Sequence, residues 1–127
     1  MKIIIESIPH QNQRYSTPGD YFYEGDTLIV KVSDLGDDRM NLLVALHEII
    51  EEATSRNAGI TEQEIMDFDL MYEKEREQGL HSQEDEPGWD NRSPYREYHA
   101  FAEKIERMAC KKLGIKWSDY NEKFSHL

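Results

Sequence analysis

The spacing of apolar residues changes from a strand pattern to a helix pattern about one third of the way along the chain. The sequence KIIIES, residues 2–7, is a short β-branched run, and the sequence DYFYEGDTLIVKVSD contains two strand-like halves around the turn residues EGD. Gly25 in this turn can adopt a positive φ, which tight hairpin turns often need. The pattern predicts a small antiparallel sheet of about three strands within residues 1–36.

From residue 37 onward, apolar residues recur at helical spacing. Either Asp37 or Asp38 can cap a first helix that ends near Arg56. The apolar stripe of this helix is expected to be Leu42, Leu46, Ile49 and Ala53. The sequence TEQE at residues 61–64 is a capping-box pattern, which predicts the start of a second helix.

The chain continues with a loop and two further helices. Residues 79–95 are rich in acids, prolines and glycines and predict a long loop or lid. Ser93 as N-cap and Pro94 at the first helical position predict a third helix that stops at Gly114, and WSDYNEKF predicts a short C-terminal helix. We therefore expect a single α+β domain over residues 1–127, with the sheet in 1–36 and the helices in 37–127.

The charge balance narrows the set of partners. Twenty-six acidic and fifteen basic residues give a net charge of -11, which disfavours general attraction to nucleic acid or an anionic membrane. Cys110, the single cysteine, cannot form an internal disulfide and is expected to be a buried or half-buried thiol. The N-terminal apolar run is far shorter than a signal peptide or a membrane span requires. The expectation is a cytoplasmic protein that acts on a protein or a small molecule.

The sequence VALHEIIEEAT, residues 44–54, carries the candidate chemistry. His47 and Glu51 lie one helical turn apart on one edge, while Glu48 projects about 100° away from His47. An imidazole and a carboxylate at this spacing can both bind Zn²⁺, and the adjacent carboxylate can act as a general base toward water. The alternative is an amphipathic helix whose histidine packs against the sheet and bonds to a carboxylate.

In this context the residues resemble a known family. A short sheet ending in LIVKV, followed by a helix that runs from NLLVAL into His47 and Glu48, resembles the zincin metallopeptidases over residues 27–102. The sequence HEIIEEAT followed by DEPG and PYREYHAFA is similar to small proteins of phages and prophages. The resemblance implies a zincin-like domain and a zinc-dependent hydrolase of peptide, other amide or ester bonds, in the host cytoplasm if phage encoded. Glu51 stands where a zincin has a histidine, and a carboxylate-rich ligand set also suits Mg²⁺ or Mn²⁺.

A third metal ligand must come from another element. The sequence YREYHAFAEKIE offers His99, the better donor, and Glu97, which resembles the third ligand of small regulatory zincins in its Glu-x-x-x-Phe-Ala setting. Glu103 follows His99 at the same spacing that separates Glu51 from His47, so it is a candidate outer or fourth ligand. We expect the metal ligands to be His47, Glu51 and His99.

The sequence leaves functions of different classes open. A metal-dependent hydrolase, with Glu48 as base and residues 79–95 as a lid, requires His47 and His99 to meet and Glu48 to border a solvent-reachable cleft. The alternative is a non-catalytic binding protein that modulates a host protein or sequesters a small ligand, with Trp89 as a contact. Trp89 can equally be a plug that pins the loop to the core. A Mg²⁺-dependent phosphohydrolase is a third option.

Overall fold

The computed structural model describes all 127 residues and contains one three-stranded sheet and four α-helices. The strands β1 (Lys2–Ile8), β2 (Gly19–Glu24) and β3 (Thr27–Ser33) lie in the order β1-β3-β2. β2 and β3 are the antiparallel arms of the predicted hairpin, and Gly25 in their turn has a φ of 58°. The β-branched run of β3 therefore forms the central strand, with a partner on each side.

The sheet is mixed, so the prediction of an antiparallel sheet is wrong at β1. β1 pairs with β3 in parallel, with Ile3 opposite Leu28 and Ile5 opposite Val30. The reason is that residues 9–18 carry the chain past the end of the sheet to its far edge before β2 begins. The hydrophobic pattern located three strands, but it carries no signal that β1 lies next to the third strand rather than the second.

The first two helices begin where their capping residues predict. α1 (Asp38–Asn57) is capped by Asp37, whose side chain accepts a hydrogen bond from the backbone N–H of Arg39. α2 (Glu62–Glu77) begins with the complete capping box between Thr61 and Glu64. These local hydrogen bonds satisfy backbone donors that an uncapped helix leaves without partners.

The third helix begins later than predicted. α3 (Arg96–Lys112) is preceded by a turn at residues 94–95, and Ser93 Oγ accepts a hydrogen bond from the Tyr95 N–H at 3.3 Å instead of capping the helix. α3 ends just before Gly114, as predicted, and α4 (Trp117–Ser125) is the short C-terminal helix. These elements confirm the α+β class with three main helices and a short last one.

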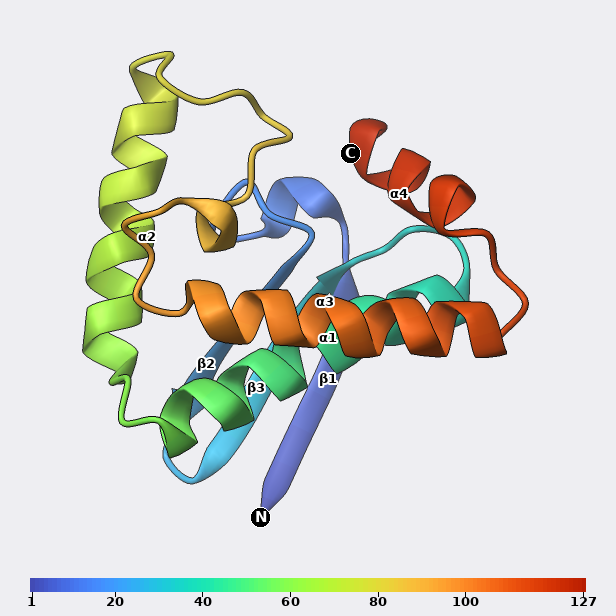
Figure 1. Cartoon of the computed structure of the whole chain (residues 1–127), viewed down its shortest axis with the longest axis horizontal. Helices are drawn as coiled ribbons and strands as arrows, with labels where there is room; N and C mark the ends of the chain where they lie inside the picture. Colours follow the sequence, from blue (N-terminus) through green and yellow to red (C-terminus); the bar gives the residue numbers. More distant parts are fainter.

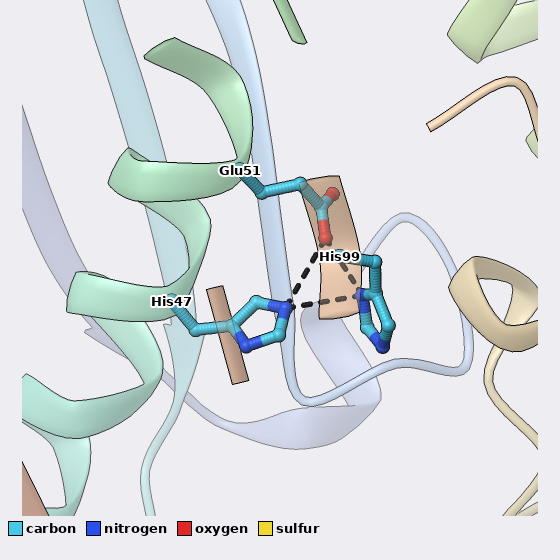
Figure 2. A group of neighbouring side chains, drawn as sticks. All are labelled: His47, Glu51 and His99. Carbon is cyan, nitrogen blue, oxygen red and sulfur yellow. Dashed lines mark hydrogen bonds and ion pairs between the residues drawn. The ribbon is translucent and has the colours of Figure 1, made fainter. Parts of the chain in front are cut away.

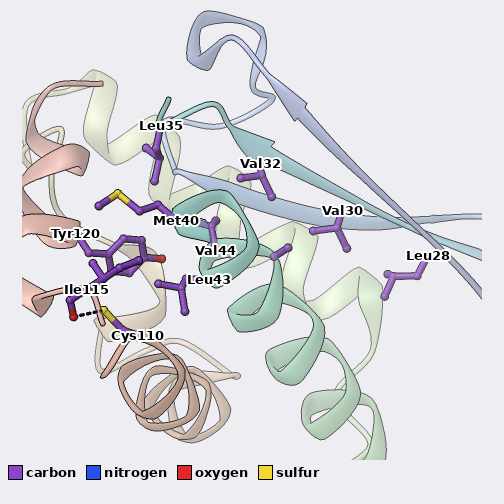
Figure 3. Packing of buried hydrophobic residues seen from close by; sticks show 11 residues of the cluster. Leu28, Val30, Val32, Leu35, Met40, Leu43, Val44, Cys110, Ile115 and Tyr120 are labelled. Carbon is purple, nitrogen blue, oxygen red and sulfur yellow. Dashed lines mark hydrogen bonds between the residues drawn. The ribbon is translucent and has the colours of Figure 1, made fainter. Parts of the chain in front are cut away.

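α1 packs on the sheet and α3 packs on α1, so the layers follow the order sheet, α1, α3 (Figure 1). α2 stands beside these layers, and residues 78–95 connect it to α3 with a 3₁₀ turn at Pro87–Trp89. The main apolar core lies between β3, α1, the end of α3 and α4 (Figure 3). It consists of Leu28, Val30, Val32, Leu35, Met40, Leu43, Val44, Ala45, Cys110, Ile115 and Tyr120. The burial of Cys110 is as predicted, and no helix has the length and apolar content needed to cross a membrane.

The buried face of α1 is not the apolar stripe that the sequence predicts. Leu42 is 55% exposed, and Leu46, Ile49 and Ala53 are only partly buried. The buried face instead includes Met40, Leu43, Val44, His47, Glu51 and Ser55. His47 and Glu51 can occupy this buried face because α3 packs on α1 and supplies their hydrogen-bonding partners. The second half of α1 thus forms the floor of the candidate site.

Candidate metal centre

Three buried side chains from two helices converge on one point, as Figure 2 shows. His47 Nε2 lies 3.1 Å from both Glu51 Oε2 and His99 Nδ1, and His99 Nδ1 lies 2.7 Å from the same Glu51 oxygen. His47 and Glu51 lie one turn apart on α1, and the packing of α3 on α1 brings His99 to them. The predicted meeting of His47 and His99 is confirmed. We call His47, Glu51 and His99 the triad.

The triad can bind a metal ion, because its three donor atoms are close enough to share one. Four ligands about 2.1 Å from a tetrahedral ion lie about 3.4 Å from one another. The observed separations of 2.7 to 3.1 Å are only slightly smaller. Small outward shifts of these side chains would therefore accommodate an ion, and two imidazole nitrogens with one carboxylate oxygen suit Zn²⁺ and neighbouring transition metals.

His47 is oriented from within the core. Its Nδ1 lies 2.7 Å from Glu106 Oε1 on α3, and the Tyr120 hydroxyl of α4 donates to the other Glu106 oxygen at 2.5 Å. Glu106 is 5% exposed and Tyr120 is fully buried. With Nδ1–H donating to Glu106, Nε2 of a neutral His47 presents its lone pair to the centre of the triad. A carboxylate behind a ligating histidine is the usual second partner of such a ligand.

His99 is met from the opposite side by the segment before α3. Glu86 Oε2 lies 2.9 Å from His99 Nε2, off the line of its N–H, so the contact is an ion pair rather than a hydrogen bond. The ring of Trp89 meets the His99 ring edge-on at 4.8 Å. Gly88 packs so closely that a Cβ atom there would overlap with His99 Cγ. This segment therefore limits where the His99 ring can lie.

Hydrogen bonds to carboxylates set the protonation of the triad. Burial alone would lower the pKa of His47, but its hydrogen bonds to Glu106 and Glu51 raise it to about 11. Burial likewise opposes protonation of His99, while its contacts with Glu51 and Glu86 raise its pKa to about 9. Burial raises the pKa of Glu51, but the two histidines hold it below its usual range. Without metal, protons therefore hold the triad together, and a metal ion must displace them.

Glu48 borders the same space without belonging to the triad. It is partly buried, lines the cavity beside the triad, and has no hydrogen-bonded or ion-paired partner. Burial, together with the charge of Glu51, raises its pKa well above the usual range. A Cβ atom at Gly19 on β2 would lie 2.5 Å from Glu48 Oε1, so the glycine leaves room for this carboxylate. Its predicted place beside a cleft is confirmed, whereas its role as a base stays a prediction.

The triad and Glu48 line a cavity of about 170 Å³. Its walls come from β2 and the preceding loop, the second half of α1, α2, residues 86–88, α3 and α4. Ten of the lining residues are acids, and the two lining arginines, Arg14 and Arg56, are each paired with a carboxylate, at 2.9 and 2.7 Å. The acids outnumber the arginines and the triad histidines together, so the cavity favours cations over anions.

The remaining sequence candidates lie at different distances from this centre. Glu97 is exposed on α3 and does not line the cavity, so the structure does not bring it to the triad. Glu103 lines the cavity but pairs with Arg107 at 3.5 Å. Trp89 is 38% exposed, and its ring and the His99 ring pack nearly perpendicular to each other, so it belongs to the wall around the triad.

Sequence reasoning missed the two carboxylates behind the histidines. Glu106 resembles a solvated partner of neighbouring basic residues when the sequence is read alone. A signal was nevertheless present, because Glu106 lies on the same helical stripe as His99, Ala102 and Cys110, all of which are buried. Glu86 lies in the segment between α2 and α3, where hydrophobic spacing gives no indication of which side chains turn inward.

Comparison with protein-family models, curated proteins and solved structures found no match to this chain. The zincin-like interpretation therefore stays a prediction, and function has to be inferred from the geometry and charge of the site.

Proposed function

We propose that this chain is a metal-dependent hydrolase of amide or ester bonds, with Zn²⁺ held by His47, Glu51 and His99. The proposal rests on one observation above all: three buried donor atoms converge within 3.1 Å of one another beside Glu48, an unpaired carboxylate in the same cavity. Two imidazoles in the donor set favour Zn²⁺ over Mg²⁺, whose ligands are mostly oxygens.

Each residue has a distinct role in this proposal. When bound, Zn²⁺ would polarise the substrate carbonyl and lower the pKa of a water molecule. Glu106 keeps the Nδ1 proton of His47 and fixes the ring, so that Nε2 remains a ligand. Residues 86–89 cover His99 and restrict water at that edge of the cavity.

Glu48 is the proton acceptor in the proposed reaction. Its carboxylate takes a proton from the attacking water and later gives it to the leaving group, an amine or an alcohol. The raised pKa of Glu48 reflects burial and repulsion from Glu51. A divalent cation at the triad would offset that repulsion and lower the pKa of Glu48, which favours the ionised form that a general base needs.

The first experiment tests the metal. Protein purified without added metal is stripped with a chelator and titrated with Zn²⁺ and Mg²⁺, and bound metal is measured by elemental analysis. We expect one Zn²⁺ per chain in the wild type and in His126→Gln, which changes an exposed histidine that does not line the cavity. We expect no stoichiometric Zn²⁺ in His47→Gln or His99→Gln. Equal Zn²⁺ binding by all four proteins would reject the site.

The second experiment tests the base. Fluorogenic peptides and nitrophenyl esters are screened with Zn²⁺-loaded protein, and Glu48→Gln is compared with Glu97→Gln, an exposed acid outside the cavity. Removal of a general base typically lowers turnover about 10² to 10⁴-fold, so Glu48→Gln should lose turnover and keep its metal, while Glu97→Gln keeps both. Metal binding without turnover of any substrate would instead support a non-catalytic binding protein.

A further inference from the structure

Two buried hydroxyl groups line the cavity without a hydrogen-bonding partner. Ser55, near the end of α1, is 1% exposed, and neither its Oγ nor the buried hydroxyl oxygen of Tyr21 on β2 makes a hydrogen bond. The adjacent Thr54 differs from Ser55, because its hydroxyl donates to the Ile50 carbonyl, four residues earlier on α1, at 2.7 Å. Buried polar groups without partners destabilise a fold, so their retention in a cavity points to a ligand.

These hydroxyls line the same cavity as the triad and as a third polar group, the carboxylate of Asp69. Ser55 follows Glu51 by one turn of α1 on the cavity-facing side. Asp69 of α2 lines the same cavity, and its Oδ1 accepts a hydrogen bond from the Tyr95 hydroxyl at 2.6 Å, which is its only hydrogen bond within the protein. Asp69 forms no salt bridge, although the charge of Arg14 acts on its carboxyl, whose pKa is raised to about 7 mainly by burial.

The surrounding wall selects the charge and the shape of a ligand. The excess of acids in the cavity, with its two arginines already paired, disfavours any anionic group. Apolar side chains line the same cavity, at the start of α2 and just before it, namely Ile60, Ile65 and Met66. A ligand with a positive end and a short aliphatic part would satisfy both features.

We propose that Tyr21, Ser55 and Asp69 form a subsite for the primary ammonium group of an aliphatic amine. An ammonium group has three donors and no acceptor, which matches two hydroxyl oxygens and one carboxylate. As a substrate feature, the subsite rests on the proposed hydrolase function: it holds the ammonium end of a substrate whose scissile bond reaches the triad. The same chemistry could come from the N-terminus of a peptide or from a lysine-like side chain.

The subsite is tested with small probes on the full chain. Butylamine and 1-butanol, which has a similar shape without the charge, are titrated into metal-free and Zn²⁺-loaded protein and followed by NMR chemical shifts. We expect butylamine to bind at least about ten-fold more tightly than 1-butanol in both forms, because hydrogen bonds to charged groups are strong. Ser55→Ala, Tyr21→Phe and Asp69→Asn should each weaken butylamine binding about ten-fold, while Thr54→Ala should leave it unchanged.

The measurements separate failure of the subsite from failure of the hydrolase. Butylamine binding that does not exceed 1-butanol binding, or that survives Ser55→Ala and Tyr21→Phe, overturns the subsite even if Zn²⁺ binds normally. Butylamine binding that these variants abolish in a protein that takes no Zn²⁺ supports the subsite and rejects the hydrolase. Melting temperatures of Ser55→Ala and Tyr21→Phe without ligand should equal or exceed that of the wild type, which verifies that the variants fold.

The two sources of the ammonium group are then compared directly. Leucinamide carries an α-ammonium group, whereas Nα-acetyl-lysine methylamide carries only the side-chain one. Tighter binding of leucinamide, lost in Ser55→Ala and kept in Thr54→Ala, assigns the subsite to a peptide N-terminus. The reverse preference with the same variant dependence assigns it to a lysine-like side chain. Failure of both to bind rejects the ammonium assignment.

Discussion

The two histidines of the triad are held in different ways. His47 is fixed on the core side, by Glu106 and Tyr120, which are both buried and hydrogen-bonded to each other. His99 is fixed on the loop side, by residues 86–89, where Glu86 is partly exposed. The residues on the core side therefore contribute to the stability of the fold, whereas the residues on the loop side can be altered with little effect on the core.

This difference assigns distinct tasks to the two sides. The distance between His47 and His99 depends on the packing of α1 and α3, and changes only if the core changes. The orientation of the His99 ring depends on a segment tethered from α2, where Arg76 donates to the Asp85 carbonyl at 2.9 Å and Arg92 pairs with Glu75 at 2.7 Å. The loop side is thus the place where ligand access can be adjusted.

The largest difference is expected between Glu106→Gln and Glu86→Gln. The amide that Glu106→Gln introduces cannot accept from both His47 and Tyr120 as the carboxylate does, and breaking a buried pair costs about 3 to 5 kcal/mol. Glu86 is partly exposed, so Glu86→Gln should cost less than about 1 kcal/mol. Urea unfolding measures both values. Zn²⁺ affinity should fall about 10 to 100-fold in Glu106→Gln and less in Glu86→Gln; equal losses of stability would contradict the contrast.

A second contrast uses the two glycines that contact the site. Gly88→Ala places a Cβ atom in overlap with His99 Cγ, close to the root of that side chain, so the ring must move. Gly19→Ala places a Cβ atom 2.5 Å from Glu48 Oε1 and 2.8 Å from its Cγ, so the Glu48 side chain must move. We expect Gly88→Ala to weaken Zn²⁺ binding at least about ten-fold, the scale of a disturbed ligand shell, and Gly19→Ala to lower turnover while Zn²⁺ affinity stays near the wild-type value. Zn²⁺ competition titrations and substrate assays distinguish the two; the opposite assignment would mean that Glu48, not His99, holds the metal.

The third prediction concerns pH. The folded-state pKa values of His47 and His99 are raised to about 11 and about 9, above about 6.5 in an unfolded chain. The stability that they contribute without metal is therefore present below about pH 6.5 and is lost as pH rises through 9 and then 11. Zn²⁺ affinity should rise over the same interval, because the ion competes with these protons. Chemical unfolding and Zn²⁺ titration at several pH values measure whether metal-free stability falls while Zn²⁺ affinity rises. His99→Gln should weaken both pH dependences, and His126→Gln should not. Stability and Zn²⁺ affinity that change in the same direction with pH would contradict the prediction.

Local chemistry explains which parts of this structure the sequence could predict. The Asp37 cap, the Thr61–Glu64 capping box and the Gly25 turn depend on a few adjacent residues, and all three are present as predicted. The triad was predictable too, because His47 and Glu51 share one helix edge. His99 lies opposite them because α3 packs on α1, and the spacing of polar and apolar residues in α3 indicated that packing.

The rest depends on long-range packing that the sequence does not encode locally. The parallel pairing of β1 with β3 follows from where residues 9–18 cross the sheet. Leu42 is exposed because the covering helix, α3, lies over the face that carries His47 and Glu51 instead. Hydrophobicity alone cannot predict that buried polar residues occupy a helix face, because their burial is tolerable only once partners such as Glu106 are in place.

Substitution of Trp89 is expected to have the smallest effect on stability and Zn²⁺ affinity. The size of that effect distinguishes a plug from a binding anchor. Its ring packs nearly perpendicular to the His99 ring, and such aromatic pairs contribute about 0.5 to 1.5 kcal/mol. As a plug, Trp89→Ala should lower stability by about 1 kcal/mol and weaken Zn²⁺ binding a few-fold, while Trp89→Phe restores most of both. As an anchor, Trp89→Ala should leave stability and Zn²⁺ affinity unchanged and weaken only the binding of a ligand or partner. Thermal unfolding and Zn²⁺ titration of the two variants separate these roles. We expect the plug, because only 38% of Trp89 is exposed and the rest of the residue is covered by the protein.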